Sequence, residues 1–160
     1  VIPETVAAGE HNLILKTSDG GSFNVGKITV VPNEMDITAN CVKQDDQNTQ
    51  MSFPVTLTWD DNGRFRIQRN APVDLTKMTW TAGKSKIKFY VSSAGQLQFN
   101  DANWSEQGTF TAAEGDKVVE VVLTQTMIDW LKGAQSDGWS NSAFIIQGSG
   151  LTITKITLVP

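Results

Sequence analysis

Short segments in which apolar and polar residues alternate make up most of the chain. Residues 51–59, 64–69, 85–91 and 96–100 place apolar side chains at every second position, which is the spacing of a β-strand with one buried face. Turn residues such as those at 60–63 separate these segments. Short, evenly spaced strands predict an all-β protein, an antiparallel β-sandwich of the jelly-roll type.

One segment has helical spacing instead. Thr124 is a candidate N-cap, Met127 and Leu131 stand four residues apart, and Gly133 is a candidate C-cap. We therefore expect one short helix near residues 125–132, which connects strands and forms no layer of its own.

The end of the chain predicts a closing hairpin. Residues 143–160 contain two strand patterns joined by Gly148-Ser149-Gly150. Residues 13–32 have the same organisation, and segments 26–32 and 154–160 are identical at five of seven positions. Either the chain carries tandem modules, or two amphipathic hairpins resemble each other because both must. We expect residues 1–32 to be the closing hairpin of a preceding module or the first hairpin of this sandwich, and 33–160 to be the main module.

Composition limits the function classes. The chain has 160 residues, 39% hydrophobic and 19% charged, which suits a single compact domain. Its net charge of −4 and scattered basic residues argue against nucleic-acid binding. No apolar stretch is long enough to insert into a membrane and no signal peptide precedes Val1, so we expect a piece of a larger protein.

The chain has little material for cysteine or histidine chemistry. Cys41 is the single cysteine, which excludes an internal disulfide and a cysteine-based zinc site. We expect it to be a small buried hydrophobe rather than a nucleophile. His11 is the single histidine and has no obvious catalytic partner.

Tryptophan is unusually frequent, with five copies against one tyrosine. Trp104 and Trp139 lie in polar loops and are candidates for exposure, whereas Trp59 has the phase of a core residue and Trp130 is expected to pack on the helix. Trp80 is undecided. Exposed aromatic rings stack on the C–H faces of sugars, and neighbouring amides or arginines bind the hydroxyl groups.

Polar side chains on the predicted outer faces could complete such a site. Arg64, Arg66 and Gln68 share a face, which is either solvated or the donor side of a groove. We expect Tyr90 to face the same side as Gln98 and Asn100. The candidate ligand-binding residues are Trp104, Trp139, Tyr90, Gln98, Asn100 and Arg66.

The runs 83–91, 95–104, 121–131 and 144–148 resemble carbohydrate-binding modules of the family-four-like and galactose-binding-like type. These are non-catalytic β-sandwiches from polysaccharide-degrading enzymes, such as xylanases, of Bacteroidetes-type bacteria. The resemblance covers roughly residues 50–160. It implies binding of a β-linked plant polysaccharide such as xylan or β-glucan, an attached glycoside hydrolase, and a secreted, periplasmic or cell-surface location.

Catalysis is not expected. A glycoside hydrolase needs two carboxylates across a cleft, but the acidic residues here fall mostly in turns. We expect no cofactor, although modules of this type often carry a structural Ca²⁺ to which residues 60–62 could contribute. A structural or adhesion module of a surface protein is the alternative function, and exposed aromatics beside amides would favour glycan binding over it.

Overall fold

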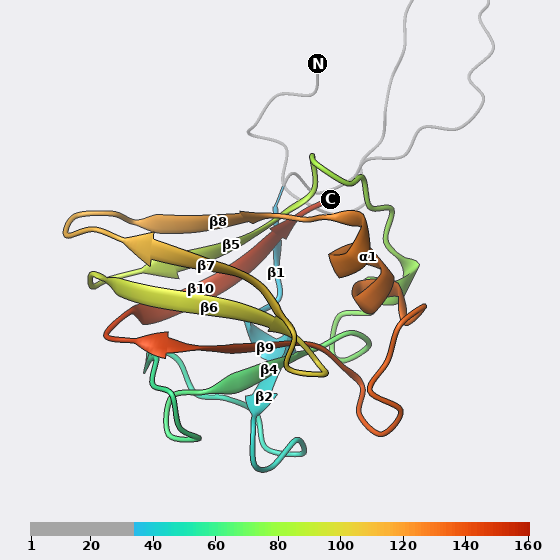
Figure 1. The fold of residues 1–160 in the computed structure, drawn as a ribbon, viewed down its shortest axis with the longest axis horizontal. Helices are drawn as coiled ribbons and strands as arrows, with labels where there is room; N and C mark the ends of the chain where they lie inside the picture. Colours follow the sequence, from blue (N-terminus) through green and yellow to red (C-terminus); the bar gives the residue numbers. More distant parts are fainter. Residues whose placement is uncertain (1–33) are drawn as a thin grey trace, which may run out of the picture. The chain divides into compact units, whose positions relative to one another are not determined.

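The computed structural model describes residues 34–160, which form two antiparallel sheets packed face to face (Figure 1). The predicted all-β sandwich with one short helix is confirmed. His11 and the hairpin predicted at residues 13–32 lie outside the described residues, so the division of the chain at Pro32 stays a prediction.

The described residues contain ten strands, two short 3₁₀ helices and one α-helix. In chain order these are β1 (Met35–Asp36), η1 (Thr38–Asn40), β2 (Cys41–Lys43), β3 (Val55–Thr56), β4 (Phe65–Gln68), η2 (Leu75–Lys77), β5 (Lys86–Val91), β6 (Gly95–Asp101), β7 (Glu106–Ala112), β8 (Val118–Val122), α1 (Gln125–Lys132), β9 (Ser142–Ser149) and β10 (Thr152–Val159).

The strands divide into two sheets of five. Sheet A has the order β1-β10-β5-β8, with β3 also pairing with β10, and sheet B has the order β2-β4-β9-β6-β7. Neighbours in both sheets are antiparallel. Each sheet therefore has one face against the core and one outer face.

Consecutive strands often belong to different sheets, which corrects the predicted closing hairpin. The strands of the closing segment are present, but β9 lies in sheet B and β10 in sheet A, so residues 150–151 cross between sheets. The turn at 60–63 likewise leads from β3 in sheet A to β4 in sheet B. A side chain at Gly63 would place its Cβ 2.2 Å from the Thr56 carbonyl oxygen, so this crossing requires glycine.

Helix α1 begins and ends where its caps predict. The Thr124 hydroxyl accepts a hydrogen bond from the Met127 N–H, and Gly133 ends the helix in the left-handed conformation with φ +75°. The helix buries Met127, Ile128, Trp130 and Leu131 at one end of the sandwich (Figure 1). No helix among residues 34–160 has the length and apolar character needed to cross a membrane.

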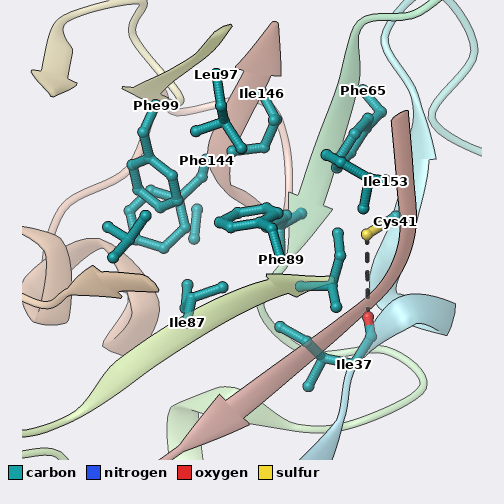
Figure 2. Packing of buried hydrophobic residues seen from close by; sticks show 14 of the residues in the cluster. Ile37, Cys41, Phe65, Ile87, Phe89, Leu97, Phe99, Phe144, Ile146 and Ile153 are labelled. Carbon is teal, nitrogen blue, oxygen red and sulfur yellow. Dashed lines mark hydrogen bonds between the residues drawn. The ribbon is translucent and has the colours of Figure 1, made fainter. Parts of the chain in front are cut away.

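Aromatic rings hold the two sheets together. Phe89 of sheet A meets Phe99 of sheet B edge to face, with ring centroids 6.2 Å apart. The ring centroid of Phe99 lies 4.4 Å from that of Phe144, which is also in sheet B. Figure 2 shows these rings between Ile87 and Ile146. Contacts of this kind add about 0.5–1.5 kcal/mol each beyond the burial of apolar area.

Cys41 lies in the same core, as predicted. Its Sγ points to the Ile37 carbonyl oxygen at 4.0 Å (Figure 2), and its side chain is fully buried. Burial, with a smaller contribution from Asp36, raises the pKa of the Cys41 thiol well above its ordinary value. The thiol is therefore an unreactive packing group.

Candidate functional site

The outer face of sheet B collects the polar groups of three neighbouring strands. In β4, Phe65 and Ile67 are in the core, so Arg66 and Gln68 stand on the other side, as does Arg64 just before the strand. The same alternation turns Gln98 of β6 and Gln147 of β9 outward, and it places Asn100 on this side too, although Asn100 is only 2% exposed. We call this surface the sheet-B face.

A row of hydrogen bonds crosses the sheet-B face over four strands. Arg64 Nε donates to Gln147 Oε1 at 2.9 Å, and Gln147 Nε2 donates to Gln98 Oε1 at 2.5 Å. Gln98 Nε2 then donates to Glu106 Oε2 at 3.0 Å, and the Thr109 hydroxyl donates to Glu106 Oε1 at 2.7 Å. Because neighbouring strands lie about 4.8 Å apart, this row spans roughly 14 Å across β4, β9, β6 and β7.

Trp104 belongs to the turn between β6 and β7 and reaches this row. Its ring centroid lies 4.9 Å from the guanidinium carbon of Arg64, and 44% of the residue is exposed. Trp104 has φ +68°, the left-handed conformation that costs a non-glycine residue about 1–2 kcal/mol. Asp101 compensates by accepting hydrogen bonds from the N–H groups of Asn103 and Ser105. The turn is therefore built to hold an exposed indole.

Trp139 lies in the loop from α1 to β9 and covers Arg66 of β4. Its ring centroid is 4.9 Å from the guanidinium carbon of Arg66, and 68% of the residue is exposed. Beneath it Arg66 is fully buried and donates from Nε to Gln44 Oε1 at 2.8 Å. Arg66 Nη1 pairs with Asp137 Oδ2 at 3.5 Å, and both side chains are 1% exposed.

Electrostatics keep both members of this pair charged. Burial alone would raise the pKa of Asp137, but hydrogen bonds from Ser140 and Trp139 and the charge of Arg66 outweigh it, so the pKa lies below its ordinary value. Burial lowers the pKa of Arg66, and Asp137 opposes that shift. An arginine stays protonated under such conditions.

Trp59 corrects a prediction. It was expected in the core with Val55 and Leu57, but it is 47% exposed because β3 ends at Thr56 and the chain turns toward β4. Its carbonyl oxygen accepts a hydrogen bond from Arg64 Nη2. A third exposed tryptophan thus lies next to Arg64, the arginine on which Trp104 stacks.

Tyr90 is separated from the other candidates. It was expected to share a face with Gln98 and Asn100, but β5 belongs to sheet A and β6 to sheet B. Its hydroxyl donates to Glu34, and Lys155 Nζ lies 5.6 Å from its ring centroid. Tyr90 is therefore part of an ion-pair network on the outer face of sheet A.

The structure brings five of the six predicted residues to one face: Trp104, Trp139, Gln98, Asn100 and Arg66. Sequence reasoning did not select Arg64, Gln147, Glu106 and Trp59. Alternation places Arg64 on the face of Arg66, and Gln147 follows the apolar run 143–146 within β9, so both could have been selected from the sequence. Trp130 is 2% exposed and packs on the helix as predicted, and Trp80 is half-buried, with its indole N–H donating to the Leu75 carbonyl at 3.0 Å.

Residues 34–160 contain no group of three or more acidic, cysteine or histidine side chains that could hold a metal ion. In the turn considered for Ca²⁺, the Asp60 carboxylate accepts hydrogen bonds from the Thr58 hydroxyl at 2.8 Å and the Asn62 N–H at 3.0 Å. These hydrogen bonds, the Thr58 one first, lower the pKa of Asp60. The carboxylate thus stabilises the turn that precedes Arg64.

The chain matches no protein-family model and no curated protein. Among solved structures it is similar to SGBP-B of the Bacteroides ovatus mixed-linkage glucan utilization locus, determined in complex with a mixed-linkage heptasaccharide. The similarity has a TM-score of 0.47 and 17% sequence identity, and it covers 78% of this chain and 28% of that chain.

Proposed function

We propose that the protein is a non-catalytic carbohydrate-binding module and that its sheet-B face binds a neutral, β-linked polysaccharide. The observation that carries this proposal is the placement of two exposed tryptophans against Arg66 of β4 and against Arg64, which immediately precedes this strand. Trp104 lies on Arg64 and Trp139 on Arg66, with the carbonyl of Trp59 also bound to Arg64. A single exposed indole is common on protein surfaces, but two held over one polar face fit the recognition of sugar rings.

The polar row that begins at Arg64, on which Trp104 stacks, suits hydroxyl groups. Amides of Gln98 and Gln147 and the carboxylate of Glu106 offer donors and acceptors in fixed positions. A row that crosses four strands favours an oligosaccharide segment over a single sugar. Xylan and β-glucan are the polysaccharides we expect, with the module acting as the binding part of a larger extracellular polysaccharide-degrading protein.

The state of the arginines favours a neutral ligand. Arg64 donates from Nε, Nη1 and Nη2 to Gln147, Asp61 and Trp59. Arg66 is fully buried and paired with Asp137. Neither guanidinium is free to bind a carboxylate of the ligand in the bidentate manner typical of arginine.

The carboxylates of this face favour binding over hydrolysis. Asp137 is buried in an ion pair, and Glu106 accepts hydrogen bonds from Gln98 and Thr109. A hydrolase instead needs one carboxylic acid with a raised pKa and a second carboxylate placed across the scissile bond. We therefore expect no release of reducing sugar from any polysaccharide that the protein binds.

Affinity electrophoresis tests the proposal. Soluble xylan, mixed-linkage β-glucan and mannan are compared with polygalacturonate, an acidic polysaccharide. We expect at least one neutral polysaccharide to retard the native protein. Trp104→Ala should lose this retardation, and Tyr90→Ala, whose side chain lies on the other sheet, should keep it in full. Retardation by polygalacturonate alone, or equal retention by both variants, would contradict the proposal.

A further inference from the structure

We infer that Asp137 is the positioning residue of the Trp139 platform: it fixes the loop so that one face of the indole rests on Arg66 while the other stays open. The effect of Asp137 on glycan binding rests on the proposed function, whereas its effect on the ring does not.

The loop between α1 and β9 has no regular structure of its own, and Asp137 organises its centre. Asp137 Oδ1 accepts from the N–H of Ser140 at 3.0 Å and from the N–H of Trp139 at 3.3 Å. Asp137 Oδ2 accepts from the Ser140 hydroxyl at 2.5 Å. One carboxylate thus binds the backbone of the tryptophan and of the residue after it.

Arg66 links this loop to the sheet. It reaches Asp137 through Nη1 and Gln44 through Nε, so the plane of the guanidinium is fixed from two directions. Arg69, a buried residue just after β4, secures both ends of the loop by donating to the carbonyl oxygens of Gln135 and Ser142. Trp139 therefore lies above a layer that has little freedom to move.

The other stack on this face provides a contrast. Arg64 and Asp61, which accompany Trp104, have side chains that are 19% and 51% exposed, whereas Arg66 and Asp137 are both 1% exposed. A solvated ion pair contributes little and is easily rearranged. A buried pair that loses one partner leaves an uncompensated charge, which is strongly unfavourable. Asp137 is thus the group whose loss should free the indole.

A rigid ring improves binding because less side-chain freedom is lost when the ligand arrives. The prediction is that Asp137 acts on binding through Trp139 alone. Asp137→Asn keeps the size of the side chain but removes the charge that pairs with Arg66, so it tests this role with little change in shape.

The first readout is the indole N–H signal of Trp139 in a ¹H–¹⁵N correlation spectrum without ligand, assigned by its loss in Trp139→Phe. We expect Asp137→Asn to shift this signal and increase the fast motion of the indole. The control is Asp74→Asn, which removes another loop carboxylate that binds a backbone N–H, a hydroxyl and a cation. It should leave the Trp139 signal unchanged.

An unchanged Trp139 signal in folded Asp137→Asn overturns the inference, whatever the protein binds. If that variant does not fold, Ser140→Ala, which removes one donor to Asp137, takes its place. We then expect a smaller shift of the Trp139 indole signal, and an unchanged signal overturns the inference.

The second readout is affinity for mixed-linkage β-glucan and xylan. We expect Asp137→Asn to weaken binding about tenfold in the native background and to have no further effect in Trp139→Ala. Equal losses in both backgrounds would show that Asp137 acts independently of the ring and overturn the inference. If the native protein binds neither polysaccharide, the proposed function has failed, and the indole signal still decides the role of Asp137.

Discussion

Replacing Trp139 by alanine should separate binding from stability. Because 68% of Trp139 is exposed, only about a third of its surface, roughly 80 Å², is covered by protein, taking about 250 Å² for a fully buried tryptophan. At about 25 cal/mol per Å², this area contributes at most about 2 kcal/mol to folding. The variant should therefore fold, with a modest decrease in the free energy of unfolding.

The same substitution should clearly weaken polysaccharide binding. Stacking of an aromatic side chain on a nucleic-acid base is worth roughly 1–3 kcal/mol, and we use this scale for sugar stacking. Trp139→Ala should then weaken polysaccharide binding by about one to two powers of ten. Isothermal titration calorimetry with soluble β-glucan or xylan fragments measures this change, and thermal unfolding measures stability on the same sample.

Trp130 is the matched control, since it is the same residue type at 2% exposure. Trp130→Ala should cost about 3–5 kcal/mol of stability, as for other large buried side chains, and leave the affinity of the folded fraction unchanged. The reasoning is refuted if Trp139→Ala lowers stability as much as Trp130→Ala does while binding is retained, because the exposed indole would then be a packing group.

Three further outcomes are expected. Gln98→Ala interrupts the polar row between Gln147 and Glu106. It should weaken polysaccharide binding about fivefold, the equivalent of one hydrogen bond of about 1 kcal/mol, and leave the melting temperature unchanged. A lower melting temperature without loss of affinity would contradict this. The folded-state pKa of Asp137 is lowered, so its contribution to stability should be complete above the unfolded pKa of about 3.9 and disappear as pH falls through the folded value. The free energies of unfolding of the native protein and Asp137→Asn, measured with denaturant, should therefore converge in acid. A difference that stays constant with pH would argue against the ion pair. Finally, residues 33–160 form a compact unit, so we propose that removing residues 1–32 leaves the melting temperature unchanged; a large decrease would make that segment part of this fold.

Much of the local structure follows from the sequence alone. Alternation identified the strands around Ile67, Phe89 and Phe99 and the sides on which Arg66, Gln98 and Asn100 stand, because a strand has a side-chain period of two. Helix α1 was predicted from the Thr124 and Gly133 caps, whose hydrogen bonds are formed within the helix ends themselves. These features depend on near neighbours in the chain, which the sequence displays directly.

The pairing of strands was decided by the tertiary structure. Tyr90 and Gln98 lie on successive strands and both point away from the core, yet β5 and β6 belong to different sheets and place them on opposite sides of the molecule. Trp59 has the phase of a core residue but follows the end of β3, and Arg66 has the phase of a solvated residue but lies buried beneath Trp139. Alternation fixes the face of a side chain within its own strand and carries no information about which strand or loop will lie beside it. The platform of indole on arginine depends on contacts between residues more than seventy positions apart, and those arise only when the sheets have assembled.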